Sequence, residues 1–123
     1  IPKIQEYLAE RKLDGWLMAD FHARNNIMMD MLKLSGMLTR RSFYFIPAMG
    51  EPVVLVNAIE KSKFANVPGK IIAYLGYRQL EAELEKLLNG YNRIAMEYSS
   101  MGRLPYIGLV DYGTIELIRS LDL

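Results

Sequence analysis

Apolar residues recur at intervals of three or four positions in four segments of the chain, the spacing that places them on one face of a helix. The clearest is 79–88, where four leucines share a face and Gly90 follows the end. Asp111 stands where its side chain can cap the first turn of the last segment. We therefore predict helices at 1–12, 23–34, 79–88 and after Asp111, with a further short helix at 59–65.

Short apolar runs between turn residues predict five strands, at 16–19, 43–48, 53–57, 70–74 and 93–98. A short link containing Gly50 joins the second run to the third, as in an antiparallel hairpin. The other runs are separated by helical segments, which favours parallel crossover connections. The expected fold is a single α/β domain over residues 1–123. It has three layers, α/β/α, and a mixed five-stranded sheet with one antiparallel hairpin.

Composition narrows the function classes. The chain has 123 residues and no cysteine, which excludes disulfides, thiolate catalysis and cysteine-ligated metal sites. A chain without disulfides also fits a cytoplasmic location. The formal net charge of +1 lacks the concentrated basic character that nucleic-acid binding needs. The longest uncharged run, residues 42–50, is far shorter than the roughly 20 residues that span a bilayer. We expect neither a nucleic-acid partner nor a membrane.

Candidate chemistry rests on one histidine and three arginines. His22 follows Asp20 just beyond a predicted strand end, where the sites of α/β proteins often lie. A loop histidine with an ordinary hydrogen bond is the competing interpretation. Arg24, Arg40 and Arg41 carry guanidinium groups, which bind carboxylates in bidentate geometry and could hold the acidic end of a substrate. A solvated strand entry or a local ion pair is the alternative.

Other residues carry weaker signals. Glu97 lies late in a predicted strand, and a buried carboxylate needs a partner. We expect a bond to a backbone amide or an arginine, with a role as a site acid as the alternative. Four methionines fit either a core or an adaptable binding surface: Met28, Met29, Met31 and Met37. Five tyrosines fit either an interface or the edge of a core: Tyr74, Tyr77, Tyr98, Tyr106 and Tyr112. No complete catalytic site is visible.

Several phrases, taken in order, resemble the N-terminal domain of the creatinase/prolidase/aminopeptidase P family. The first are LDGWL (13–17), DF (20–21), LTRR (38–41), FYFIPA (43–48) and GEPV (50–53). The phrases AMEYS (95–99), LPY (104–106) and VDYGTIELIRSL (110–121) are similar to the end of that domain in Xaa-Pro peptidase-like members. Each phrase is short, and the specificity lies in their order and spacing over nearly the whole chain.

The resemblance implies a ribonuclease H-like fold for this chain and a larger catalytic domain of the pita-bread type, expected after residue 123. In the family, that second domain binds two divalent metal ions (manganese, cobalt or zinc), and a metal-bound water attacks the peptide bond before proline. Its Asp, His and Glu ligands have no counterparts in this sequence. We therefore expect the chain to hold no metal and to be non-catalytic. Its first residue is Ile1, which fits a piece of a longer protein.

The resemblance also implies what such a domain does. In the family it narrows access to the active site and builds a homodimer, and in some members an arginine on one of its loops holds the substrate in the neighbouring subunit. The best-matched positions for this role are Arg40 and Arg41, with His22 and Arg24 nearby. The implied partners are its own C-terminal catalytic domain, a second copy and a peptide substrate.

The sequence departs from the family pattern in one region, and two other interpretations of the chain remain open. Many prolidase-type members carry an Asn-x-x-Tyr-Leu-x-Gly phrase after the first strand, whereas residues 25–36 lack that tyrosine. The chain could instead be a stand-alone binding module. It could also be the N-terminal domain of a non-peptidase or degenerate scaffold member of the family.

Overall fold

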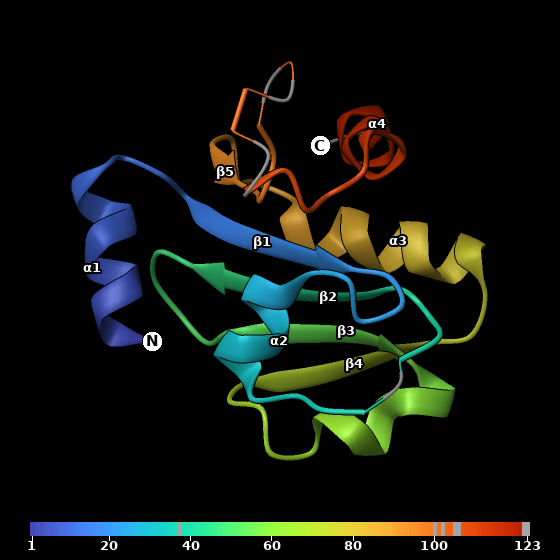
Figure 1. Cartoon of the computed structure of the whole chain (residues 1–123). Helices are drawn as coiled ribbons and strands as arrows, with labels where there is room; N and C mark the ends of the chain where they lie inside the picture. The colour runs from blue at the N-terminus through green and yellow to red at the C-terminus, as the bar shows by residue number, and fades with distance from the viewer. Residues whose placement is uncertain (37, 100, 102, 105–106, 122–123) are drawn as a thin grey trace.

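The computed structural model describes residues 1–36, 38–99, 101, 103, 104 and 107–121 (Figure 1). Three residues of the sequence predictions lie outside the described residues: Met37 of the methionine cluster, Pro105 of a predicted loop and Tyr106 of the tyrosine group. The elements are α1 (Pro2–Glu10), β1 (Gly15–Asp20), α2 (Asn26–Leu32), β2 (Ser42–Pro47), β3 (Val53–Asn57), the 3-10 helix η1 (Ala58–Phe64), β4 (Lys70–Tyr74), α3 (Tyr77–Leu88), β5 (Ile94–Ala95) and α4 (Tyr112–Ser120).

The five strands form one mixed sheet in the order β4-β3-β2-β1-β5. Strand β2 is antiparallel to both of its neighbours, β1 and β3, while β4 is parallel to β3 and β5 is parallel to β1. The expected hairpin between β2 and β3 is confirmed. The class, α/β with a five-stranded mixed sheet, is the one predicted from the sequence.

The connection from β1 to β2 differs from the expectation of a parallel crossover. The two strands pair antiparallel, with Gly15 opposite Pro47 and Asp20 opposite Ser42. The intervening helix α2 has seven residues, or about 10 Å of rise. A six-residue strand is about 20 Å long. Because α2 is too short to carry the chain back along the sheet, β2 starts at the edge where β1 ended.

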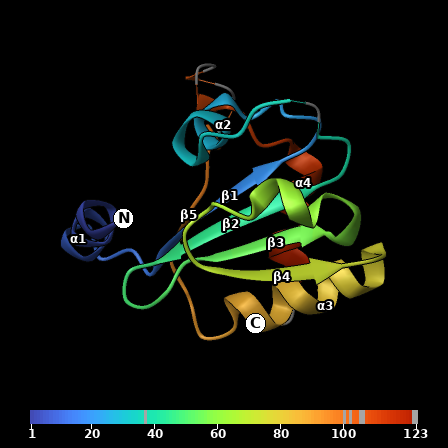
Figure 2. The same ribbon diagram turned by 90° about the horizontal axis from the view of Figure 1, so that it is seen from below.

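Each face of the sheet is covered by helices, which gives the three-layer α/β/α arrangement. Figure 2 shows α2 and α3 on opposite sides of the strands. Alternate residues of a strand point to opposite faces, so the central strand β2 is buried along its whole length. One core contains Leu17, Ala19, Phe43, Phe45 and Leu55 against Leu80, Leu84 and Leu88 of α3 and Ile115 of α4, and the other contains Met18, Tyr44, Ile46, Val54 and Val56 against Leu8, Met28, Leu32 and Phe64.

Helix α2 is shorter than the predicted 23–34. Ala23 has a left-handed backbone with φ of 57° and cannot belong to the helix. The side chain of Asn25 then caps the first turn, with Oδ1 accepting the Met28 N–H at 3.1 Å. Met28 is fully buried, and Met29 and Met31 pack against the same core. The structure therefore favours the core interpretation for these three methionines.

Strand β5 is also shorter than the predicted 93–98. Only Ile94 and Ala95 pair with β1. Beyond them the backbone changes partner, because the Glu97 carbonyl accepts the N–H groups of Leu109 and Val110 at 2.9 and 3.0 Å. The segment that precedes α4 is thereby held beside the sheet.

Candidate functional site

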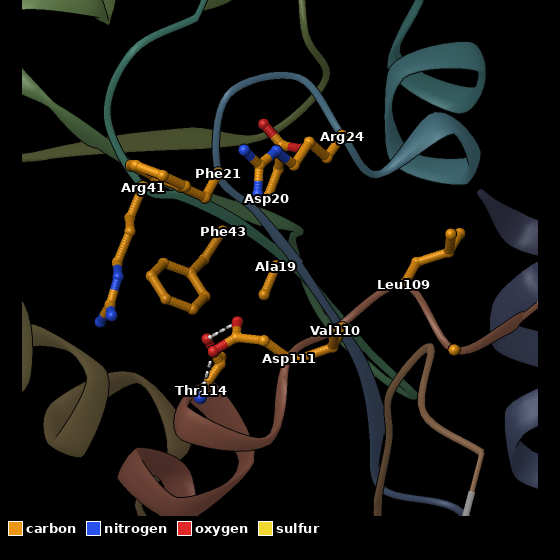
Figure 3. Close-up of a pocket in the computed structure, with 11 residues that line it drawn as sticks. Ala19, Asp20, Phe21, Arg24, Arg41, Phe43, Leu109, Val110, Asp111 and Thr114 are labelled. Carbon is orange, nitrogen blue, oxygen red and sulfur yellow. Dashed lines mark hydrogen bonds between the residues drawn. The ribbon is translucent and has the colours of Figure 1, made fainter. Parts of the chain in front are cut away.

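A cavity of about 560 Å³ opens beside the carboxyl end of β1 (Figure 3). Ala19 and Phe43, from β1 and β2, give it an apolar floor. One wall is the loop after β1, and the opposite wall is the segment 108–111 with the first turn of α4. Two arginines line it, Arg24 from the loop after β1 and Arg41 from the residues before β2, and their guanidinium groups point in different directions (Figure 3).

The loop after β1 has an unusual backbone that is fixed by Asp20. His22 and Ala23 both adopt left-handed conformations, with φ of 63° and 57°. Each such residue other than glycine costs about 1–2 kcal/mol. The Asp20 carboxylate offsets this cost by accepting the N–H of Ala23 at 2.9 Å and the N–H of Asn25 at 2.7 Å. Asp20 is itself buried, so the turn is held from within the fold.

Aromatic and cationic side chains meet on the outside of this turn. The Phe21 ring lies 4.4 Å from the His22 ring, centroid to centroid. The Arg24 guanidinium carbon is 5.9 Å from the Phe21 centroid, within range of a cation–π interaction. Phe21 is 46% exposed although it is apolar. Phe21 and Arg24 line the cavity, whereas His22 is not among its lining residues.

The segment that carries Arg40 and Arg41 is held by a second buried carboxylate. Glu60 is 3% exposed and accepts the N–H groups of Thr39 and Arg40 at 2.8 and 3.0 Å. The Tyr74 hydroxyl donates to the Arg41 carbonyl at 2.5 Å. Both arginine side chains are exposed. The backbone that presents them is therefore fixed, while the guanidinium groups remain accessible.

Arg40 and Arg41 face different spaces. Arg41 lines both the cavity and an adjacent hollow of about 450 Å³, which Phe21 also lines. Arg40 lines the adjacent hollow but not the cavity. Its side chain donates to Thr39 Oγ1 at 3.2 Å. Of the candidates from the sequence, the structure thus brings Arg24 and Arg41 together in one cavity and places Arg40 beside it.

One of the two acidic residues that line the cavity, Asp111, directly precedes α4. Asp111 caps this helix and accepts the Thr114 hydroxyl at 2.6 Å and the Thr114 N–H at 3.2 Å. The Thr114 side chain is the main cause that holds the pKa of Asp111 below its ordinary value, and the charge of Arg41 contributes less. Within the described part of the chain, neither Arg24 nor Arg41 forms a salt bridge. Neither guanidinium group is therefore neutralised by a salt bridge in that part of the chain.

Behind the loop lies Glu97, whose side-chain partners are not the arginine that was one expectation. Its carboxylate accepts the Trp16 indole N–H at 2.6 Å and the Asn25 side-chain amide at 2.5 Å. Its own backbone amide also contributes a hydrogen bond, which is the other expected kind of partner. Glu97 is 5% exposed. Burial raises its pKa above the ordinary value, against the opposing effect of the hydrogen bonds from Asn25, Trp16 and its own backbone amide. Glu97 does not line the cavity.

The lining of the cavity combines two guanidinium groups, from Arg24 and Arg41, with two acidic residues, Asp20 and Asp111, beside an apolar floor. Guanidinium groups can donate to a carboxylate in bidentate geometry. No three His, Asp or Glu side chains among the described residues converge to hold a metal ion. No helix in the described ranges is long and apolar enough to cross a membrane.

Sequence reasoning identified the arginines by residue type but missed the residues that complete the cavity. Phe21, Thr114 and the segment 108–111 carried no site signal of their own. The available signal was topological, because the carboxyl ends of parallel strands and the helices that follow them meet at one edge of a sheet.

Comparisons with known proteins bear on the fold. No family model matches the sequence, and no curated protein is significantly similar to it. A creatinase/prolidase N-terminal domain of an Xaa-Pro dipeptidase from Streptococcus pyogenes has a TM-score of 0.72 at 14% identity, with 98% of this chain and 85% of that chain covered. A proline dipeptidase structure from Streptococcus agalactiae has a TM-score of 0.73 at 13% identity, with coverages of 97% and 83%.

The fold is also similar to part of a longer protein, the prolidase from Pyrococcus horikoshii, with a TM-score of 0.65 and 18% identity. There 95% of this chain is covered but only 28% of the prolidase. Identities this low establish the fold alone. The chain therefore has the fold of the creatinase/prolidase N-terminal domains of Xaa-Pro dipeptidases.

Proposed function

We propose that this chain is the non-catalytic N-terminal domain of an Xaa-Pro dipeptidase-type hydrolase, whose catalytic domain follows residue 123. The proposal is supported by a structural likeness over 97–98% of the chain to domains of dipeptidases. The match to about a quarter of a prolidase leaves room for such a second domain. That domain, and not this chain, supplies the divalent metal ions and the hydrolysis itself.

The observation that carries the proposal is the pair of arginines over an apolar floor. A dipeptide ending in proline presents one carboxylate attached to an apolar ring. Arg24 and Arg41 lack salt-bridge partners among the described residues, and either guanidinium group can hold that carboxylate. Ala19 and Phe43 can contact the ring. In this role the domain orients the substrate and limits its length, since a longer peptide has no carboxylate at that position.

The surface around the cavity supports a second part of the proposal, that this edge of the sheet faces a catalytic domain within a homodimer. Exposed aromatic side chains and arginines are enriched at protein interfaces. Five large apolar residues, Phe21, Ile59, Leu75, Tyr77 and Tyr112, are between 46% and 76% exposed. Each follows a strand end or begins a helix at this edge, close in the chain to the strand ends that surround the arginines.

Hydrolysis of Leu-Pro tests the proposal, with the intact gene product and the 123-residue chain assayed side by side in Mn²⁺ or Co²⁺. We expect turnover by the intact product and none above a metal-only blank by the chain. Turnover by the chain alone would contradict the non-catalytic role. A folded, metal-loaded intact product without turnover would contradict the peptidase assignment and favour a binding or scaffold role.

A further inference from the structure

Glu97 is connected to both walls of the cavity. Its backbone carbonyl accepts the N–H groups of Leu109 and Val110, which line one wall. Its side chain accepts the amide of Asn25 at 2.5 Å, and Asn25 directly follows Arg24 on the other wall. One residue outside the cavity therefore joins two segments that are far apart in the sequence.

Asn25 links Glu97 to the turn after β1, because its other polar groups are hydrogen-bonded within and beside that turn. It is fully buried. Its side-chain amide also donates to the Ala19 carbonyl at 2.9 Å, and its Oδ1 accepts the Met28 N–H at 3.1 Å. Its backbone N–H donates to Asp20. A shift of the Glu97 carboxylate would consequently move Asn25 and, with it, the adjoining turn that carries Arg24.

The contacts of Glu97 require a carboxylate. Both partners, the Trp16 indole and the Asn25 amide, are N–H donors, so both oxygens of Glu97 must accept. A glutamine would turn its own NH₂ group toward one of these donors. Burying a carboxylate without a cationic partner is costly. An apolar residue would fill the same space without that cost, but it would leave the indole and amide donors without their acceptor.

We propose that Glu97 is a positioning residue for the arginine-lined cavity, fixing the loop that carries Arg24 against the segment 108–111. The effect of Glu97 on substrate binding rests on the proposed function of the arginines. The effect of Glu97 on the geometry of the loop does not depend on that function.

Amide hydrogen exchange and ligand binding test the proposal on the 123-residue chain. Glu97→Gln is compared with Trp16→Phe, which removes the other hydrogen bond to the same carboxylate but leaves the Asn25 bond in place. Exchange is measured at the Asn25 and Met28 amides relative to core amides of β2. Binding of the dipeptide Ala-Pro is followed by NMR shifts of the arginine Nε–H groups.

We expect Glu97→Gln to speed exchange at Asn25 and Met28 by about tenfold or more and to weaken Ala-Pro binding by about fivefold. Trp16→Phe should change both by less than about twofold. Unchanged exchange in Glu97→Gln, or an equal increase in Trp16→Phe, would overturn the positioning role.

The two proposals fail differently. If the wild-type chain does not bind Ala-Pro, the carboxylate-binding function fails, while the exchange comparison still decides the role of Glu97. If Glu97→Gln does not fold, Glu97→Asp withdraws the same two oxygens by one methylene and serves the same comparison. If the Asn25 amide exchanges faster in Glu97→Asp than in Trp16→Phe, the positioning role is supported. Equal exchange in the two variants overturns it.

Discussion

Glu60 fixes the segment that presents Arg40 and Arg41, and its replacement by alanine measures how strongly. The side chain is buried, and its two oxygens accept the N–H groups of Thr39 and Arg40. A third contact is the ammonium group of Lys63 at 3.7 Å, whose side chain is 46% exposed. Glu60→Ala removes all three interactions together.

The magnitude follows from the burial of each partner. A hydrogen bond to a charged group is worth about 1.5–3 kcal/mol when both groups are buried. Water can reach the two amides in part once the carboxylate is gone, which reduces the loss to about 2–4 kcal/mol in total. The exposed ion pair adds at most about 1 kcal/mol. A domain of this size is stable by about 5–15 kcal/mol, so the variant should remain folded.

Urea denaturation followed by the fluorescence of the single tryptophan, Trp16, measures this loss. The matched control is Glu83→Ala, because Glu83 also pairs with a lysine three residues later, Lys86, at 3.8 Å. We expect the control to change the free energy of unfolding by less than about 0.5 kcal/mol. If Glu60→Ala costs no more than Glu83→Ala, the carboxylate does not hold the arginine segment and the reasoning is refuted.

Two further predictions concern a glycine and a helix cap. Gly69 has φ of 110°, and a Cβ there would overlap the carbonyl oxygen of Pro52. Gly69→Ala should therefore lower the unfolding free energy by more than about 2 kcal/mol, whereas Gly90→Ala, which also has a positive φ but open space, should lower it by about 1 kcal/mol. Asp111 has a lowered pKa, so its ionised form stabilises the fold above about pH 4 and this contribution is lost on acidification. Between about pH 4 and pH 2, the unfolding free energy should fall more steeply in the wild type than in Asp111→Asn, as measured by urea denaturation at each pH, and parallel profiles would contradict this.

Local patterns predicted the elements whose ends are set by nearby residues. Strands 53–57 and 70–74 were placed to the residue, because turn residues bound their apolar runs. Segments whose ends depend on distant partners were misplaced. β5 ends early because the Glu97 carbonyl bonds to Leu109 and Val110, and no local pattern encodes that pairing.

The cations near the cavity could be predicted, but the way the cavity is built could not. Guanidinium chemistry singled out Arg24, Arg40 and Arg41, of which Arg24 and Arg41 line the cavity. The bonds behind them join residues that are far apart in the sequence: 81 positions separate Trp16 from Glu97, and 72 separate Asn25 from Glu97. Such pairs follow from sheet topology, which places the start of β1 beside β5.

We propose that the arginines of this domain hold the substrate of a dipeptidase, and steady-state kinetics of the intact gene product on Leu-Pro test this role most directly. We expect Arg41→Ala to lower kcat/KM about tenfold or more, mainly through a higher KM. Arg11→Ala is the control, because Arg11 follows the end of α1, lies over the Tyr7 ring and does not line the cavity. It should leave kcat/KM within about twofold of the wild type. Unchanged kinetics in both Arg41→Ala and Arg24→Ala would contradict the account.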